Sequence, residues 1–206
     1  MKIVKPRCDI SLPISGVEIL KHIEKCGRVC YKSEHKITED SYKTFVANII
    51  KRGHEAVLEH SSFSVTFTCD RGVSHEIVRH RLASYCQEST RYCNYEKEEF
   101  GGNISVIEPC YLTPGTEGYE IWKKACEDAE KAYFDMLNFG CSPQEARAVL
   151  PNSLKTEIVM TANLREWRHF LKLRTSMAAH PQIREVSNML LAELKTLIPI
   201  IFDDID

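Results

Sequence analysis

Residues 62–69 read SFSVTFTC, and apolar side chains alternate with hydroxyl side chains along the whole stretch. In an extended chain, one side would carry the apolar residues Phe63, Val65, Phe67 and Cys69. The serines and threonines would lie on the other side. This period of two, built from aromatic and β-branched residues, predicts a β-strand with one buried face. Shorter patterns of the same kind predict strands over residues 103–107 and 154–160.

Helices are predicted on both sides of this strand. Apolar periodicity and capping residues place them over residues 15–26, 41–51, 73–84, 117–139, 142–150, 163–171 and 182–197. The clearest start signal is Ser15 with Glu18, which fits a capping box, and Gly53 is a clear stop. Few strands among long helices predict an α/β chain of the α+β kind. We expect one domain over residues 1–206, because no linker or repeat divides the sequence.

The composition excludes several classes of protein. A net charge of −2 and a pI near 6.5 argue against a general nucleic-acid or anionic-membrane binder. No signal peptide and no apolar run of roughly 18 residues are visible, so we expect a cytoplasmic protein. The nine cysteines form no C-x-x-C pair, which predicts reduced thiols and no zinc site. His54 and His60 flank two glutamates without the H-E-x-x-H spacing, so no metal is predicted there either.

A cluster of basic residues lies between residues 71 and 91. It comprises Arg71, His75, Arg79, His80, Arg81 and Arg91. The acidic residues that offset this charge in the same stretch are Asp70, Glu76 and Glu88. On a helix over residues 73–84, this cluster would surround a multiply charged anion. The polar loop at residues 87–91 would offer N–H groups and hydroxyls to phosphate oxygens. The alternatives are a solvated basic helix followed by a polar loop, and a nucleic-acid contact that the net acidity disfavours.

Arg79-His80-Arg81, followed after seven residues by Ser89, is the R-H-R-x7-S pattern, and here the chain resembles the flavin-dependent thymidylate synthases. Further segments agree with that family in order. They are residues 28–31, His54-Glu55 with Glu59-His60, Arg147 with Leu150-Pro151, Asn163, and Leu171 with Leu173-Arg174. The resemblance covers about residues 28–200.

The resemblance implies a fold and a reaction. The fold would be a small antiparallel sheet flanked by long helices, in a homotetramer whose active sites draw on several subunits. The reaction would make dTMP from dUMP with methylenetetrahydrofolate as the carbon donor and FADH2 as the hydride donor, and NADPH would re-reduce the FAD. No enzyme cysteine would attach to the uracil ring. A non-catalytic nucleotide- or flavin-binding protein of the same family is the alternative.

The resemblance also implies the residues of the site. Arg174 would activate the uracil ring by stabilising negative charge at its N3/O2 edge. The predicted dUMP contacts are Glu76, Ile77, Val78, Arg79, Gln87, Glu88, Ser89, Thr90, Arg91, Arg147 and Arg174. The predicted FAD contacts are His54, Arg79, His80, Arg81, Gln87, Asn163, Leu164, Arg165 and His169. Glu76 and His169 depart from the family's usual glutamine and asparagine. Ser89 is expected to contact dUMP, not to act as a nucleophile, and Trp167 and Phe170 are expected in the core.

Overall fold

The computed structural model describes residues 1–97 and 101–206, which form two compact units. The first unit comprises Met1–Arg7, Phe67–Arg79 and Cys86–Ile158. The second comprises Cys8–Thr66, His80–Tyr85 and Val159–Asp206. A single domain over residues 1–206 stays a prediction.

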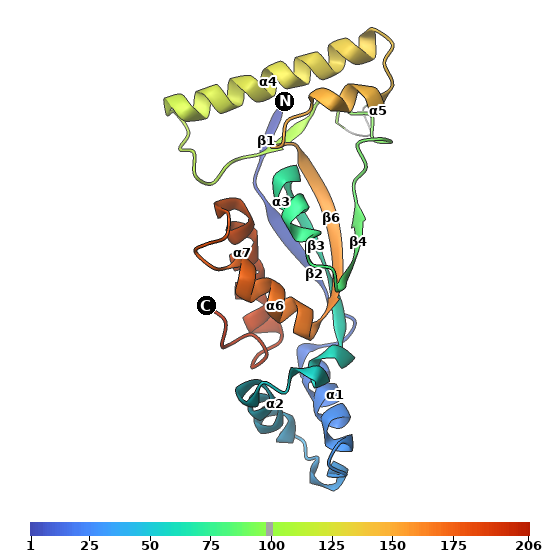
Figure 1. The fold of residues 1–206 in the computed structure, drawn as a ribbon, viewed down its shortest axis with the longest axis vertical. Coiled ribbons are helices and arrows are strands. Elements are labelled where there is room, and N and C mark those ends of the chain that lie inside the picture. Colours follow the sequence, from blue (N-terminus) through green and yellow to red (C-terminus); the bar gives the residue numbers. More distant parts are fainter. Residues whose placement is uncertain (98–100) are drawn as a thin grey trace. The chain divides into compact units, whose positions relative to one another are not determined.

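Four strands form a small antiparallel sheet in the order β2-β3-β6-β4 (Figure 1). Strand β1 pairs with β5 in parallel. In the parallel pair, Ile3 lies opposite Val106. The bounds are β1 (Lys2–Val4), β2 (Arg7–Ser11), β3 (Ser62–Asp70), β4 (Ala83–Gln87), β5 (Ser105–Ile107) and β6 (Lys155–Asn163). This mixture of a small sheet and long helices confirms the predicted fold class.

The helices follow their local signals closely. The α-helices are α1 (Gly16–Val29), α2 (Ser41–Arg52), α3 (Arg71–Ile77), α4 (Glu117–Asn138), α5 (Pro143–Ala146), α6 (Leu164–Arg174) and α7 (Pro181–Leu197), and 3₁₀ turns cover Glu34–Lys36, Glu55–His60 and Arg147–Val149. The Ser15 hydroxyl accepts from the Glu18 N–H at 3.3 Å, and the Glu18 carboxylate accepts from the Ser15 N–H at 3.0 Å. Helix α2 ends at Gly53, whose φ of 68° is left-handed. Both signals are therefore confirmed.

The prediction of one helix over residues 73–84 is wrong. Helix α3 starts earlier, because the Asp70 carboxylate accepts from the Val73 N–H at 2.7 Å, and it ends at Ile77. Residues 83–87 form strand β4, next to β6 in the sheet. The Glu88 N–H continues that side of the sheet with a 2.8 Å bond to the Glu157 carbonyl. Arg79, His80 and Arg81 therefore lie in the connection between helix and strand and do not fan around a helix.

The predicted strands are present, with shifted ends. Strand β3 confirms the opening pattern, although its last four residues are all buried, so its end is covered on both faces. Residues 103–107 and 154–160 correspond to β5 and β6. Strands β1 and β2 were not predicted from the sequence.

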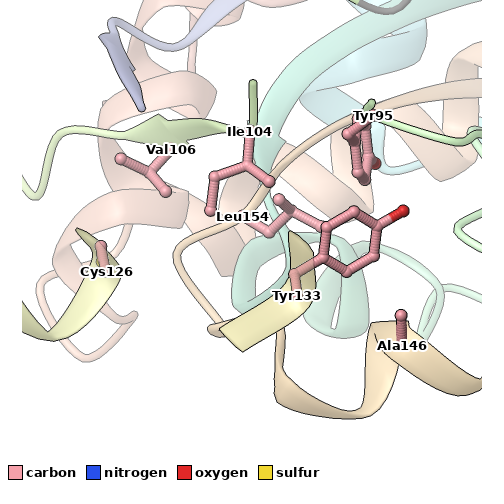
Figure 2. Close-up of a cluster of buried hydrophobic side chains, with 7 residues drawn as sticks. All are labelled: Tyr95, Ile104, Val106, Cys126, Tyr133, Ala146 and Leu154. Atoms are coloured by element: carbon pink, nitrogen blue, oxygen red, sulfur yellow. The ribbon is translucent and has the colours of Figure 1, made fainter. Parts of the chain in front are cut away.

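The core of the first unit lies between α4, α5 and the β5 region. Figure 2 shows the Tyr133 ring beside Leu154 and Ile104, with the Tyr95 ring nearby. The two tyrosine ring centroids are 5.8 Å apart. Val106, Cys126 and Ala146 complete this cluster. Burying these side chains fixes α4 against the segment that carries β5.

The core of the second unit holds helix α6 in place. The Trp167 ring stacks on Phe63 with centroids 5.0 Å apart, and its Nε1–H donates to the Phe63 carbonyl at 3.2 Å. Phe170 packs edge-on against Trp167. Both α6 aromatics are fully buried, which confirms their predicted place in the core. Among the described residues, no helix has both the length and the apolar character that crossing a membrane requires.

Candidate functional site

His80 is the centre of a buried polar group in the second unit. Its Nδ1 lies 3.1 Å from a Glu166 carboxylate oxygen, and the Arg174 Nε lies 3.1 Å from its Nε2. A guanidinium nitrogen only donates, so Nε2 must offer its lone pair. The proton of a neutral ring then resides on Nδ1 and is donated to Glu166. Burial lowers the pKa of His80, although the hydrogen bond to Glu166 opposes that shift.

Helix α6 supplies the other members of this group at helical spacing. The Asn163 side-chain oxygen caps α6 by accepting from the Glu166 N–H at 2.9 Å, which fixes Glu166 in the first turn. One turn later, the rings of His169 and Phe170 lie edge-on to His80, with centroid distances of 5.5 and 4.8 Å. Arg174 is the last residue of the helix. Helix α6 therefore fixes the positions of three polar neighbours of His80, namely Glu166, His169 and Arg174.

The ligand-type atoms of His80, Glu166 and His169 lie within 4.8 Å of one another, a spacing that a metal ion could bridge. The direction of the hydrogen bonds argues against that use. With Arg174 donating to Nε2, the His80 Nδ1 carries a proton and has no lone pair for a cation. The cluster is therefore best described as a hydrogen-bonded group.

A cleft of about 810 Å³ opens beside this group in the second unit. It is lined by Glu55, Glu59, Leu82, Asn163, Arg165, Glu166, Arg168, His169 and Lys172. Three of the predicted FAD contacts, Asn163, Arg165 and His169, lie in it together. Their amide, guanidinium and imidazole groups are hydrogen-bond donors, which suit the carbonyls and ring nitrogens of a flavin. The residues of this cleft therefore fit a flavin ring.

Ion pairs hold the rim of the cleft. Arg165 pairs with Glu59 at 2.6 Å, and Arg168 pairs with Glu55 at 3.0 Å and with Asp204. Arg168 is almost fully buried, so its pairs fix the base of α6. These cations are partnered within the chain. To bind a ligand, the Arg165 guanidinium would either contact it alongside Glu59 or give up its ion pair with Glu59.

Three other predicted FAD contacts of the second unit lie elsewhere. Leu164 is buried, and its N–H donates to the Ser61 carbonyl at 3.0 Å. His54 lines a separate cavity of about 780 Å³ between α1 and α2, together with Arg28, Lys36 and other residues. Arg81 is exposed next to Leu82. The structure thus does not bring His54 into the cleft of Asn163.

Two predicted phosphate-binding arginines lie near one loop of the first unit. The Arg147 guanidinium lies 3.5 Å from the Thr90 hydroxyl, and the Arg91 Nε donates to the Gln144 side-chain oxygen at 3.2 Å. The Ser89 hydroxyl accepts from the Arg91 N–H at 3.3 Å, which shapes the turn. Arg91 and Arg147 are both exposed. This loop therefore gathers cations, hydroxyls and N–H groups of the kind that bind phosphate.

Gln87 and Glu88 place their side chains inside the first unit. The Gln87 amide donates to the Ser74 hydroxyl at 2.9 Å. The Glu88 carboxylate accepts from Lys155 at 3.0 Å and from the Tyr95 hydroxyl at 3.0 Å. These side chains brace the loop that carries Ser89.

The remaining predicted dUMP contacts also belong to the first unit. Ile77 is fully buried in α3, Glu76 is half-buried, and Val78 and Arg79 are exposed in the turn after the helix. Arg79 therefore lies in a different unit from His80 and Arg81.

Sequence reasoning missed Glu166, Lys155 and Tyr95. Glu166 carries one local signal, since it is the third residue after a helix-capping asparagine. That signal explains a helix start, but it does not reveal a contact with His80, which is 86 residues away.

The chain is similar in sequence to proteins of one family. The model of the thymidylate synthase complementing protein family matches residues 17–200. The flavin-dependent thymidylate synthase of Pyrococcus abyssi is 38% identical over 164 residues, which cover 79% of this chain and 66% of that protein. The enzyme of the same name from Pyrococcus furiosus is 34% identical, with 88% and 74% covered, and that from Corynebacterium glutamicum is 31% identical, with 98% and 85% covered.

A solved structure extends the comparison to the fold. The UMP/dUMP methylase PolB from Streptomyces cacaoi, bound with 5-Br dUMP, matches with a TM-score of 0.78 at 22% identity, over 98% of this chain and 96% of that one. This likeness defines the class of fold. The family model and the relatives above 30% identity then decide the membership: the chain belongs to the flavin-dependent thymidylate synthase family. It spans about two thirds of the length of the Pyrococcus abyssi relative.

Proposed function

We propose that the protein converts dUMP to dTMP by reductive methylation. Methylenetetrahydrofolate is the carbon donor, FADH2 the hydride donor, and NADPH the reductant that regenerates it. The proposal is supported by the family membership and by relatives that are named flavin-dependent thymidylate synthases. The observation that carries it is the contact between Arg174 and a buried, neutral His80, because it orients a permanent cation beside the cleft whose donors suit a flavin.

The chemistry balances without an enzyme nucleophile. The methylene carbon would form a bond to C5 of the uracil while its two bonds to the folate nitrogens break. The hydrogen on C5 would leave as a proton, and this proton and one from the reduced flavin would end on the folate nitrogens. Reduced flavin, held by the donors of the cleft, would supply the hydride that completes the methyl group. The folate therefore leaves at the tetrahydrofolate level, and no cysteine needs to attack the ring.

Arg174 acts on the uracil ring in this proposal. A guanidinium held at the N3/O2 edge stabilises negative charge on that edge before the bond forms, and this makes C5 a better nucleophile. His80 contributes by fixing the Arg174 Nε at 3.1 Å. Arg174 thereby both binds dUMP and activates it.

The phosphate of dUMP would be held in the first unit. Arg91 and Arg147 offer guanidinium forks, and Ser89 and Thr90 add hydroxyl groups. The segment from Glu76 to Arg79 and the pair Gln87 and Glu88 remain predicted dUMP contacts.

The flavin would be held by donors of the second unit. Asn163, Arg165 and His169 line the cleft. His80, Arg81 and Leu164 remain predicted contacts of the same unit, and Arg79 and Gln87 of the first. His54 lies in its own cavity, so it would reach a flavin or folate from a second direction.

Within the second unit, His54 and Asn163 line different hollows, and this supports an assembly as well. We propose a homotetramer in which several subunits contribute to each site. We also propose a cytoplasmic location, because all nine cysteines, each in a described segment, are free thiols. Light scattering of the purified protein checks the first point.

The test is an absorbance spectrum followed by a reaction. Purified protein should retain flavin bands through gel filtration, and it should form dTMP when given dUMP, methylenetetrahydrofolate, FAD and NADPH. Omitting the folate should leave dUMP unchanged. A protein that neither retains nor binds FAD overturns the proposal. Flavin binding without dTMP formation identifies the non-catalytic binder of the same family.

A further inference from the structure

Glu166 belongs to none of the predicted contact sets, yet it is buried against His80. We propose that Glu166 is a positioning residue that fixes the tautomer of His80 and, through it, the orientation of Arg174. The inference rests on the proposed function for its catalytic consequence. Its structural part is a chain of two hydrogen bonds, from Arg174 to His80 and from His80 to Glu166. These bonds can be tested whether or not the protein forms dTMP.

The argument starts from the donors. Arg174 presents an N–H to Nε2 of His80, and an imidazole accepts there only when Nε2 has no hydrogen. A free imidazole in water favours the opposite tautomer, with the hydrogen on Nε2. That tautomer would set two N–H groups against each other at 3.1 Å. Some group must therefore favour the hydrogen on Nδ1.

Glu166 is the group that does this. Its carboxylate oxygen lies 3.1 Å from Nδ1 and only accepts from it. The side chains of His80 and Glu166 are 2% and 7% exposed, so water is a poor substitute for either partner. A buried N–H without an acceptor is unfavourable, because the group has lost its hydrogen bond to water and gained nothing in return. That cost is enough to decide between the two tautomers.

Among the described contacts of the His80 ring, Nδ1 has its hydrogen bond to Glu166, and the other groups meet the ring in other ways. His169 and Arg174 come from α6, and Phe170 of the same helix offers a ring edge. Tyr85 of β4 donates its hydroxyl to the His80 backbone carbonyl at 2.6 Å, and burial raises its pKa to about 12, which keeps it protonated. Glu166 is the carboxylate that faces the ring from the elements packed against it in the described chain.

The experiment reads the tautomer directly. NMR spectra of protein labelled with ¹⁵N-histidine distinguish a protonated from an unprotonated ring nitrogen by its chemical shift. The His80 signals are identified as those that disappear in His80→Gln. In the wild type, we expect the hydrogen on Nδ1. Glu166→Gln keeps a side-chain oxygen acceptor and should retain that tautomer, whereas Glu166→Leu should move the hydrogen to Nε2. A wild-type hydrogen on Nε2, or an unchanged tautomer in Glu166→Leu, overturns the proposal.

Kinetics provide the second readout. Partners that orient metal-bound histidines contribute about 10–100-fold to activity. We expect a loss of kcat of similar size in Glu166→Leu, with a smaller change in the KM for dUMP. Glu166→Gln should recover most of the loss. A loss of kcat that is equal in both variants overturns the positioning role. The tautomer can be measured without substrate or flavin. A protein that makes no dTMP would therefore contradict the proposed function but not the role of Glu166 in fixing the tautomer.

Glu166→Gln also decides the matter if Glu166→Leu does not fold. Glu166 raises the pKa of His80 through its hydrogen bond and its charge. A neutral glutamine removes the charge, so the acidic limb of the kcat profile should move to lower pH. Thermal unfolding followed by circular dichroism confirms that the variant is folded. A limb that stays in place contradicts the proposal, because a purely structural role would not move it.

Discussion

Arg174 is half-buried at the end of α6, and its Nε is directed at His80. Fixing Nε sets the plane of the whole guanidinium, and therefore the directions of its terminal N–H bonds. A lysine at this position would keep the charge but lose that directional control. The residue thus contributes geometry as well as charge, and the two contributions can be separated by substitution.

Arg174→Ala should lower the rate of dTMP formation by about 10²- to 10³-fold, the usual cost of removing one preorganised donor. FAD binding should change little, because Arg174 lies outside the set of cleft-lining donors. Single-turnover formation of dTMP and the flavin absorbance spectrum measure the two effects. Arg174→Lys is the matched control and should recover only part of the rate. Equal loss of flavin and turnover in Arg174→Ala would show that its role is misassigned.

His80 links stability to pH. Its pKa in the folded protein is below the ordinary value of 6.5 because the ring is buried. As the pH falls through about 6.5, the unfolded chain therefore takes up a proton that the folded chain resists, and folding becomes less favourable. Stability from this group is fully present above pH 6.5 and is lost as the pH falls toward the lower folded pKa.

Between pH 7.5 and 5.5, the wild type should therefore lose more free energy of unfolding than His80→Gln. Glutamine does not titrate, and its side-chain oxygen can still accept from Arg174. Urea unfolding at several pH values, followed by circular dichroism, provides the measurement. Carboxylates elsewhere affect both proteins alike, so parallel pH curves would refute the assignment of this effect to His80.

At the level of elements, the start of α1 and the end of α7 meet closely within the second unit. Gly16 is the first residue of α1, and a Cβ built on it would lie 1.8 Å from the Leu197 carbonyl oxygen. The obstruction is backbone, which cannot rotate away as a side chain can. The missing side chain of Gly16 is thus what lets these two helix ends approach.

Gly16→Ala should cost about 1–3 kcal/mol of unfolding free energy, because a methyl group is forced into occupied space. Gly118→Ala in α4 is the control. Its Cβ would meet only Leu112 at 3.7 Å, an ordinary contact, so stability should be unchanged or slightly higher. Denaturant unfolding of both variants measures the difference. A Gly16→Ala protein as stable as the control would mean that the helix ends separate at little cost.

Elements with local signals could be predicted from the sequence, and elements defined by distant partners could not. The capping box of Ser15 and Glu18 lies within four residues, so the start of α1 was visible. Strand β4 has weak alternation of its own and is a strand because it pairs with β6, about 70 residues later. Residues 73–84 were therefore predicted as one helix. Short β1 and β2 were missed for the same reason.

The same limit applies to the site. The motif around Arg79 and Ser89 identified the family, and the grouping of Arg91 and Arg147 near one loop agrees with a phosphate site. The contact of His80 with Glu166 joins residues 86 positions apart, and only the fold reveals it. A motif indicates which residues matter. It does not say which side chains orient them.

Over the whole molecule, the cysteines are numerous and distributed through both units. All nine are free. Burial raises the thiol pKa of four of them, Cys8, Cys69, Cys93 and Cys126, and that of Cys8 reaches about 11. A raised pKa disfavours the thiolate, which is the nucleophilic form. These thiols therefore behave as packing groups, in keeping with a reaction that needs no cysteine.

Cys26 is the one cysteine whose surroundings resemble a nucleophile and base pair among the described contacts, because its sulfur lies 3.5 Å from the His22 Nε2. The same Nε2 lies 3.2 Å from the His60 carbonyl oxygen. A carbonyl only accepts, so Nε2 carries a hydrogen and cannot take the thiol proton. Cys26→Ser and Cys26→Ala should therefore both keep kcat for dTMP formation within about twofold of the wild type, since an unactivated thiol contributes nothing to the barrier. Steady-state assays with equal flavin loading test this, and loss of turnover in a folded, flavin-loaded Cys26→Ser protein would require a covalent cysteine step.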